Sequence, residues 1–482
     1  MQTRLIEEFA RVAAKNPKKI ALITEKSQLC YDDLLALVQT LDMQLSARGV
    51  RDGQTIVLSS IRGEFSIAFA LLLSLRSWTV IFANIRRVLE SGIDFDRAVV
   101  TEESDLLPAD KQIVIEQNWF TSLGTVPAFD YSKITGAGGN FVIQSSGTTG
   151  TPKFILSSEL ARLHDMRAMA HYSAEEFAKM RFLTSSGVNT SWAMNTNLPV
   201  LLGGGSVISL ADHSSSLLQY IDLHNVTHLA TTPALISDTL KLVNPQQFLR
   251  SLQGVLVAGA YAPPGLMERL SEMSTAKIIF AYGATETGAL CQAVYSSNSN
   301  DHDGYLGDLY RNDVELVFFN DALELQTDAT EGLAGFKLSA SSGKRYLKET
   351  AEEKKTGFVG DYFVPGDVLR REGDSLYFLG RIKNVINVNG AKYSLDLIRR
   401  VLDHSFIKSD FEPLAILDAE GMEQLFVCYA APTEIAESAI ISVLRGAFSN
   451  IGTVQSKRIS KMPITLSGKV DIQRLKRSLA NL

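Results

Sequence analysis

The feature that most constrains this chain is a short apolar strand that runs directly into a loop of small residues. Phe141-Val-Ile143 is apolar and rich in β-branched side chains, which is typical of a buried strand. Ser145 to Lys153 then holds five hydroxyl side chains, two glycines, a proline and a closing lysine. Glycine lets backbone N–H groups approach an anion, while the hydroxyls and Lys153 add donors and a positive charge. The pattern favours a polyphosphate site over a flexible surface loop, although it lacks the Gly-Lys-Ser/Thr of a P-loop.

These nine residues, Ser145-Ser-Gly-Thr-Thr-Gly-Thr-Pro-Lys153, resemble the phosphate loop of a known superfamily. It comprises the adenylate-forming (AMP-binding) enzymes: acyl- and aryl-CoA synthetases, luciferases and peptide-synthetase adenylation domains. The resemblance implies that ATP and Mg2+ are used, and that Thr148 is catalytic as well as nucleotide-binding. The nucleotide-binding residues that it implies in this loop are Ser145, Ser146, Gly147, Thr148, Thr149, Gly150 and Lys153.

Length, charge and cysteine content exclude several other classes of protein. The 482 residues are enough for two or three domains, and the net charge of -6 without a basic block argues against a nucleic-acid partner. The three cysteines lie far apart and share no metal-ligand spacing, as expected of reduced thiols in the cytoplasm. The longest apolar run, Ile67 to Leu75, is too short to span a membrane, and the charged start does not resemble a signal peptide. We therefore expect a cytoplasmic protein without a membrane partner.

Short β-rich runs alternate with helical segments, which indicates an α/β fold built around largely parallel sheets. Thr55–Leu58, Thr79–Phe82 and Gly254–Ala258 are examples of such strands. Residues 1–380 are expected to form a large N-terminal domain of βα sheets that binds ATP and the carboxylate. Within it, residues 304–380 are hydrophilic and punctuated by glycine, which suits a β-rich subdomain. Residues 384–482 are expected to form a small α+β C-terminal domain, which the resemblance implies is mobile and rotates.

A second stretch of the chain matches the superfamily at Tyr282-Gly-Ala-Thr-Glu-Thr-Gly288. Tyr282 offers a flat face to a purine, and Gly283 lets that base come close. Glu286 is a carboxylate that can hold Mg2+, a cation that prefers oxygen ligands; alone, it would be interpreted as a solvated loop acid. Thr285 is counted among the nucleotide-binding residues. The resemblance implies that Gly259, Ala260 and Tyr261 line the other side of the adenine.

Two further motifs precede the expected domain boundary. Asp367, in Gly366-Asp367, can accept two hydroxyl hydrogen bonds and so clamp a ribose, although Gly-Asp is also common as a plain turn. By resemblance, Arg381 reaches the ribose and phosphate, and Lys383 is the hinge about which the C-terminal domain rotates. The superfamily's Pro-x-Glu is missing after Gly390, which weakens any conclusion about how this face meets a thiol partner.

The last motif is Pro463-Ile-Thr-Leu-Ser-Gly-Lys469, whose lysine enters the active site in similar enzymes. Lys469 is therefore expected to stabilise the charge that develops when a carboxylate attacks the α-phosphorus of ATP. The resulting acyl-adenylate would pass to coenzyme A or to the phosphopantetheine of a separate acyl carrier protein, since few residues follow Lys469 to form a carrier domain. The alternatives are a degenerate, non-catalytic AMP-binding protein and a luciferase-like enzyme.

The substrate is expected to be a carboxylic acid without an α-amino group, aryl or acyl in character. Amino-acid-activating relatives carry an aromatic-Asp pair for the ammonium, and the nearest match here is Val188-Asn189. A neutral amide leaves a buried ammonium without the charge that it needs. Asn189 and Trp192 are thus predicted to lie near the substrate. The alternatives are that Asn189 caps a helix and that the chain is an amino-acid adenylation enzyme.

Overall fold

The computed structural model divides into two compact units, and each is described separately. The first comprises residues 1–230, 285–288 and 339–351, and the second comprises 231–284, 289–338 and 352–482. The structure describes residues 4–121, 129, 134, 138–145, 153–166, 172–210, 217–242, 244–296, 304–320, 322–338, 344–348, 357–382, 384–388, 391–417, 423–448, 451, 454–465 and 468–479. Within these ranges, no helix combines the length and the apolarity that crossing a lipid bilayer requires.

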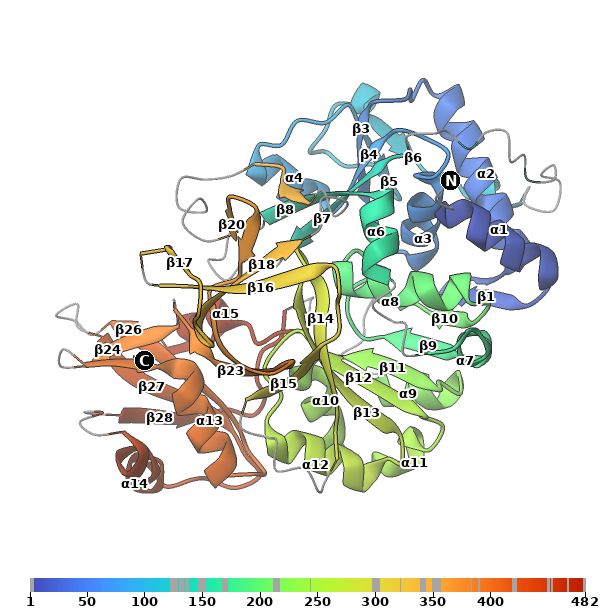
Figure 1. Cartoon of the computed structure of the whole chain (residues 1–482). Helices are drawn as coiled ribbons and strands as arrows, with labels where there is room; N and C mark the ends of the chain where they lie inside the picture. Colours follow the sequence, from blue (N-terminus) through green and yellow to red (C-terminus); the bar gives the residue numbers. More distant parts are fainter. Residues whose placement is uncertain are drawn as a thin grey trace. The chain divides into compact units, whose positions relative to one another are not determined.

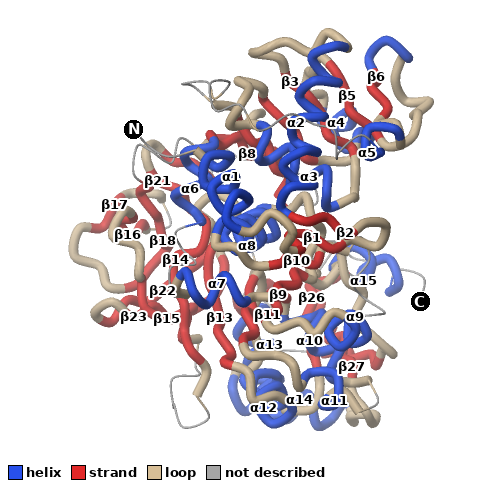
Figure 2. The backbone as a smooth tube through the Cα atoms, turned by 90° about the vertical axis from the view of Figure 1, so that its right-hand side faces the viewer, coloured by secondary structure: helices blue, strands red, loops and turns tan. Residues whose placement is uncertain are grey.

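The first unit contains a seven-stranded sheet in the order β19-β8-β7-β4-β3-β5-β6. Its β3, β4, β5, β6 and β7 pair in parallel, whereas β8 is antiparallel to β7 and β19 to β8. Figure 2 shows β3, β5 and β6 side by side. The strands are β3 (Thr55–Ser59), β4 (Thr79–Phe82), β5 (Arg97–Val100), β6 (Gln112–Val114), β7 (Asn140–Ser145), β8 (Lys153–Ser158) and β19 (Arg345–Tyr346).

A second set of strands in the first unit pairs in the order β2-β1-β10-β9-β11, parallel except for β1 with β2. These are β1 (Ile20–Ile23), β2 (Gln28–Cys30), β9 (Arg181–Thr184), β10 (Ser206–Ile208) and β11 (His228–Thr231). The helices of the unit are α1 (Leu5–Lys15), α2 (Tyr31–Ala47), α3 (Gly63–Leu72), α4 (Ile85–Ser91), the 3₁₀ turn η1 (Ala109–Lys111), α5 (Asn118–Thr121), α6 (Glu159–Met166), α7 (Ala174–Lys179), α8 (Ser191–Leu202) and α9 (Leu217–Leu223).

The second unit begins with a parallel pair, β12 and β13, and continues with antiparallel strands. Antiparallel pairing links β14 to β15, β15 to β23, β23 to β22, β22 to β18 and β18 to β16. The elements are α10 (Pro233–Leu240), α11 (Gln246–Leu249), β12 (Gly254–Ala258), α12 (Pro264–Met273), β13 (Lys277–Ala284), β14 (Gly288–Val294), β15 (Tyr305–Leu309), β16 (Val314–Phe319), β17 (Leu325–Gln326), β18 (Glu331–Leu338), β20 (Gly357–Val359), β21 (Tyr362–Val364), β22 (Asp367–Glu372) and β23 (Ser375–Arg381).

The C-terminal part of the second unit has hydrophobic clusters of its own. One joins Ile386, Ile398, Leu425 and Ile440, and another joins Leu414, Met462 and Leu475. In Figure 1 the strands β26 and β27 lie beside α13, coloured orange. The elements are β24 (Val385–Val388), β25 (Ala391–Ser394), α13 (Leu395–Ser405), β26 (Asp410–Leu417), β27 (Glu423–Ala430), α14 (Glu437–Ala447), β28 (Val454–Arg458) and α15 (Ile472–Leu479).

The predicted α/β fold class is confirmed. Capping residues explain why several helices begin where they do, because each supplies a side-chain acceptor to a free backbone N–H. Thr232 accepts from Leu235 N with Pro233 in the first turn of α10, and Ser394 accepts from Leu397 N at the start of α13. The boundary between domains at 380–384 stays a prediction.

Asp403, on α13, predicts a pH dependence of stability. Burial raises the pKa of this carboxyl well above its ordinary value; Arg399 lowers it, and Asp410 and Glu412 raise it again. Because the folded-state pKa exceeds the unfolded one, folding takes up a proton, and this group's contribution to stability increases as the pH falls between the two pKa values. We expect Asp403→Asn to be more stable than the wild type at high pH, with the difference shrinking by up to about 1.4 kcal/mol per pH unit on acidification.

Denaturant unfolding at several pH values measures this difference. Asp374→Asn is the matched control, because it removes one carboxylate from the same unit at a side chain that is 81% exposed. A pH-independent difference between Asp403→Asn and the wild type would contradict the assignment of a raised pKa.

Candidate active site

The β7–β8 hairpin positions the two ends of the predicted phosphate loop opposite each other. Ser145, the last residue of β7, pairs in register with Lys153, the first residue of β8. In this antiparallel pair, Val142 and Ile143 of β7 lie opposite Leu156 and Ile155 of β8. The other predicted loop residues, Ser146, Gly147, Thr148, Thr149 and Gly150, lie outside the described residues.

Tyr346, which sequence reasoning missed, connects two of the predicted site residues. Its hydroxyl donates a 2.9 Å hydrogen bond to Oε1 of Glu286, and the Lys153 ammonium lies 4.8 Å from the centre of its ring. The position of Tyr346 follows from strand pairing, since β19 aligns Tyr346 with Ile155 of β8. The structure therefore brings Lys153 of the first motif and Glu286 of the second to the same aromatic side chain.

A buried ion pair holds the backbone of the second motif next to α6. The Lys344 ammonium lies 2.6 Å from the Asp165 carboxylate, and both side chains are buried. Lys344 also donates to the carbonyl of Thr285 at 3.3 Å. Thr285, predicted to bind nucleotide, is thus fixed through its backbone one residue before Glu286.

Glu286 fits the role of a magnesium ligand. It is a buried carboxylate with one hydrogen-bonded oxygen, which leaves acceptor capacity on its second oxygen. Among the described residues, no group of three or more His, Cys, Asp or Glu side chains forms a metal cluster. One carboxylate combined with substrate phosphates is nevertheless a usual way for proteins to hold Mg2+.

In the second unit, three predicted residues from separate motifs form one cluster. The Tyr282 hydroxyl donates to Oδ2 of Asp367 at 2.7 Å, and Arg381 Nε donates to Oδ1 at 2.6 Å. Burial raises the pKa of Tyr282 well above its ordinary value, with a further contribution from the charge of Asp367. The same carboxylate raises the pKa of Arg381. Both oxygens of the predicted ribose clamp are therefore already hydrogen-bonded, and the Tyr282 ring lies 6.4 Å from that of Phe336.

Lys469 and Gly259, from different motifs, also meet within the second unit. A Cβ built at Gly259 would lie 3.8 Å from Lys469 Cε, and Gly259 has a left-handed φ of +90°. A turn presents the lysine, because Gly468 N donates to Thr465 O and Thr465 N to Lys469 O. The Thr232 hydroxyl donates to Gly468 O. Ala260 follows Gly259 at the exit of β12 and is partly buried.

Tyr261 and Lys383 are two further residues predicted from the motifs. Tyr261 is partly buried, and the guanidinium carbon of Arg400 lies 6.0 Å from the centre of its ring. Lys383, the predicted hinge, lies outside the described residues.

Asn189 has a structural partner on each side of its amide. Its Oδ1 accepts from the Ser66 hydroxyl and its Nδ2 donates to the Ser60 carbonyl, both at 2.6 Å. The cap of α8 is Thr190 rather than Asn189, since the Thr190 hydroxyl accepts from Ala193 N. Trp192 lies in the first turn of α8, and its buried indole nitrogen has no hydrogen-bond partner.

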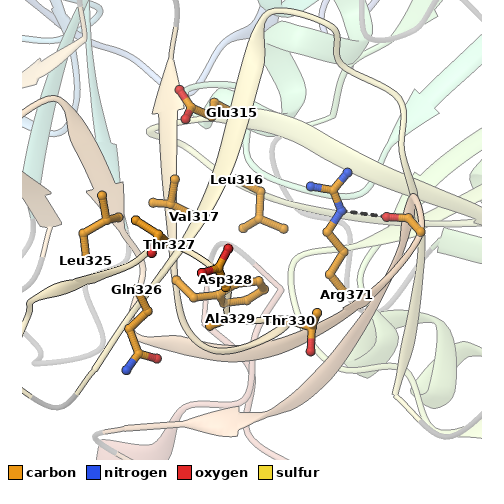
Figure 3. Close-up of a pocket in the computed structure, with 12 residues that line it drawn as sticks. Glu315, Leu316, Val317, Leu325, Gln326, Thr327, Asp328, Ala329, Thr330 and Arg371 are labelled. Atoms are coloured by element: carbon orange, nitrogen blue, oxygen red, sulfur yellow. Dashed lines mark hydrogen bonds between the residues drawn. The ribbon is translucent and has the colours of Figure 1, made fainter.

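A groove of about 550 Å³ lies elsewhere in the second unit (Figure 3). It is formed by β16, β17 and the turn 327–330, and its Arg371 donates to Gly373 O at 2.6 Å. None of the predicted nucleotide or carboxylate residues lines it, so the groove belongs to neither cluster.

Comparison with known proteins confirms the resemblance proposed from the motifs. Residues 104–332 match the family model of the AMP-binding enzymes. Gramicidin S synthase 1 of Brevibacillus brevis is 24% identical over 97% of this chain, which spans only 44% of that relative. The D-alanine–D-alanyl carrier protein ligase of Bacillus licheniformis is 20% identical, over 98% of this chain and 99% of its own. This chain spans less than half of the length of most of the curated relatives that it matches.

Solved structures share the fold at lower sequence identity. ATP-bound MatB of Rhodopseudomonas palustris superposes with a TM-score of 0.80 at 16% identity, covering 99% of both chains. Klebsiella oxytoca NpsA, in complex with 3-hydroxyanthranilyl-AMSN, gives 0.80 at 17% identity and covers both chains completely. Identities this low show the fold alone.

The Asp367 cluster predicts a stability effect for Arg381. In Arg381→Met, the buried Asp367 keeps Tyr282 but loses its cationic partner, so we expect the second unit to lose about 1–3 kcal/mol of unfolding free energy. Arg371→Met, on the paired strand β22, removes a guanidinium whose carboxylate partner Asp374 is largely exposed, and should cost about 0.5 kcal/mol or less. Denaturant titration measures both, and equal losses would refute a structural ion pair at Asp367.

Proposed function

Since residues 104–332 form an AMP-binding enzyme domain, we propose that this protein activates a carboxylic acid as an acyl-adenylate and transfers it to a thiol as a thioester. In the first step a carboxylate oxygen attacks the α-phosphorus of ATP, and pyrophosphate leaves. In the second, a thiol attacks the carbonyl of the acyl-adenylate, giving the thioester and AMP. Neither step requires a nucleophile from the protein.

The observation that carries this proposal is the meeting of Lys469 with Gly259. The Cε of Lys469, from the last motif, lies 3.8 Å from a Cβ built at Gly259. Gly259 is the residue predicted to flank the adenine. A cation in that position stabilises the negative charge that spreads over the attacking oxygen, the phosphorus and the leaving group. The turn 465–469 and the Thr232 bond fix the backbone from which this side chain extends.

The other clusters have separate roles in the same step. The loop 145–153, with Lys153, would bind the phosphates. The nucleoside would be bound by Asp367, Arg381 and Tyr282, after the hydrogen bonds among these three side chains rearrange. Tyr346 keeps Glu286 oriented through its 2.9 Å bond. Glu286 would hold Mg2+, which neutralises phosphate charge when bound.

The second step is proposed to follow a rotation of residues 384–482 about Lys383, so that one small domain completes two sites in turn. The acceptor is coenzyme A or the phosphopantetheine of an acyl carrier protein. The name of the Bacillus licheniformis relative, a carrier protein ligase, supports the carrier protein as a candidate. We assign the protein to the cytoplasm on its composition.

The proposed substrate is an aryl or acyl carboxylic acid without an α-amino group. Support comes from Asn189, a neutral side chain whose amide is engaged by Ser60 and Ser66. The alternative, amino-acid activation, is favoured by one relative, since the name of the Bacillus licheniformis ligase includes the amino acid D-alanine. A degenerate, non-catalytic protein is disfavoured, because Lys469 and Glu286 are both present.

Pyrophosphate exchange into ATP on a panel of acids tests this function. We expect faster exchange with acids that lack an α-amino group, such as benzoates, cinnamates and short fatty acids, than with any of the twenty amino acids. An amino acid as the best substrate would refute the substrate class but not the adenylation. Exchange with no acid at all would refute the adenylation itself.

Lys469→Ala should separate the two half-reactions. Because the lysine acts on charge that develops only during adenylation, we expect a loss of pyrophosphate exchange on the order of 10²-fold or more. Thioester formation from preformed acyl-adenylate and thiol should stay near the wild-type rate. Lys461→Ala, which removes an exposed lysine from the same segment, is the control. An equal loss in both half-reactions would contradict the assigned role of Lys469.

A further inference from the structure

The turn that carries Lys469 packs against the beginning of helix α10. The Thr232 hydroxyl, which caps this helix, donates to the Gly468 carbonyl. A Cβ built at Gly468 would lie 2.6 Å from Leu235 Cδ1 and 3.0 Å from Thr232 Cγ2, and this glycine has a left-handed φ of +76°. Only a residue without a side chain fits so close to the helix in this conformation. The place of Lys469 therefore depends on how residues 384–482 contact α10.

The other end of α10 binds a carboxylate from the same C-terminal part of the chain. Asp410 is the first residue of β26, and its two oxygens accept from the Ser237 hydroxyl at 2.9 and 3.0 Å. The Lys241 ammonium, one helical turn further along, donates to Oδ2 of the same carboxylate. The Arg269 guanidinium of α12 lies 3.8 Å from Oδ1. One carboxylate thus joins β26 to two helices.

These ion pairs are less exposed than ordinary surface ion pairs. The side chains of Asp410 and Arg269 are 18% and 17% exposed, and that of Lys241 is 32% exposed. Charges that are partly removed from water are screened less by salt, and hydrogen bonds to a charged group are stronger than neutral ones. Loss of the Asp410 charge would take an anionic partner from both cations at once. We therefore expect this contact to contribute measurably to the position of β26.

A glycine allows α12 to approach the segment just before Asp410. A Cβ built at Gly265 would lie 2.9 Å from the carbonyl oxygen of Ile407 and 3.3 Å from its Cα. A side chain at Gly265 would therefore push the backbone of residue 407 away from α12. Figure 1 shows α12 near α13, the helix that precedes Ile407. The close approach at Gly265 and the ion pairs of Asp410 hold the same short segment.

A hydrophobic cluster connects Asp410 to the turn 465–469 within the C-terminal part. Leu414 of β26 and Met462 belong to one buried cluster, and Val470 packs against it. Closely packed side chains transmit a displacement rather than absorb it. A shift of β26 away from α10 would therefore move the turn 465–469 as well.

We propose that Asp410 is a positioning residue that keeps Lys469 beside Gly259, so that its contacts with α10 and α12 favour adenylation over thiol transfer. This inference rests on the proposed function and concerns the balance between its two half-reactions. While Asp410 is bound, the turn with Lys469 stays at the adenylation site. A rotation of residues 384–482 would have to break these contacts before thioester formation. Their strength would then decide how readily the protein leaves the first step.

Substitution of Asp410 should affect the two half-reactions differently. In Asp410→Asn, we expect kcat for pyrophosphate exchange to fall on the order of 10-fold, because hydrogen bonds to a charged group are lost. The KM for the acid should stay close to the wild-type value, since Asp410 acts through Lys469. Thioester formation from preformed acyl-adenylate and thiol should be as fast as in the wild type or faster. Glu434→Gln, which removes an exposed carboxylate from the same part of the chain, is the control and should change neither step.

Two further variants test the contact without removing the carboxylate. Gly265→Ala should lower pyrophosphate exchange and spare thioester formation through a steric effect that changes no charge. Lys241→Met should lower exchange in the wild-type background but add little to Asp410→Asn, because the two side chains act through one contact. Fully additive losses from Lys241→Met and Asp410→Asn would overturn the assignment of Asp410 to this contact.

The outcomes separate this inference from the proposed function. An equal loss in both half-reactions of Asp410→Asn, or no loss of pyrophosphate exchange, would overturn the role of Asp410 and leave adenylation intact. A wild-type protein that exchanges pyrophosphate with no acid would overturn the proposed function, and this inference with it.

Hydrogen exchange of backbone amides gives a readout that does not depend on turnover. In Asp410→Asn and Gly265→Ala, amides of α10 and of the turn 465–469 should exchange faster than in the wild type, whereas those of β27 should keep their protection. Unchanged protection of α10 and the turn would overturn the inference. Faster exchange in β27 as well would show that Asp410 stabilises the C-terminal part as a whole, which would also overturn it.

Discussion

The interior of the first unit depends on the pairing of charges that its sequence buries. Removing a carboxylate from water is tolerable only when donors replace the lost solvation. Glu159 meets this condition with Arg4 and Leu5 N, and Asp165 meets it with Lys344. Glu159, at the start of α6, links this helix to residues 4 and 5, and Asp165, near its end, links it to residue 344. The two pairs therefore join segments that are far apart in the sequence. The lysine of the second pair also holds the Thr285 carbonyl, and so the backbone beside Glu286.

The second unit shows the same rule at Asp367. Tyr282 and Arg381 each donate to one oxygen of this carboxylate, so three motifs separated by up to a hundred residues of sequence are fixed to one another. Such bonds hold the three side chains in place relative to one another. The backbone of Lys469 is held in a turn, because Gly468 N donates to Thr465 O and Thr465 N to Lys469 O.

Much of this arrangement could be predicted from local sequence. The strands at Thr55, Thr79 and Gly254 follow from short apolar runs, and their structural bounds agree with those runs to within a residue. The motifs of unusual composition also predicted the superfamily correctly, because few other functions need glycine, hydroxyl groups and a lysine in one loop. Asp367 and Arg381 were assigned separately to the ribose, however, and their bond to each other was not foreseen. Contacts between side chains depend on strand register, which composition does not reveal.

The functional residue that sequence analysis missed was missed for the same physical reason. Tyr346 lies in a two-residue strand that carries no periodicity of its own, and only its pairing with β8 brings it to Glu286. The bonds of the Asn189 amide to Ser60 and Ser66 were likewise not foreseen from the sequence, and its place near the substrate stays a prediction.

The central claim is that a carboxylate oxygen attacks the α-phosphorus of ATP. The most direct measurement uses the best substrate acid labelled with ¹⁸O in its carboxylate, followed by mass spectrometry of the AMP and pyrophosphate released in the presence of an acceptor thiol. Attack at the α-phosphorus transfers one labelled oxygen to AMP and none to pyrophosphate, and this is the result that the account predicts. Unlabelled AMP, or label in pyrophosphate or inorganic phosphate, would contradict it.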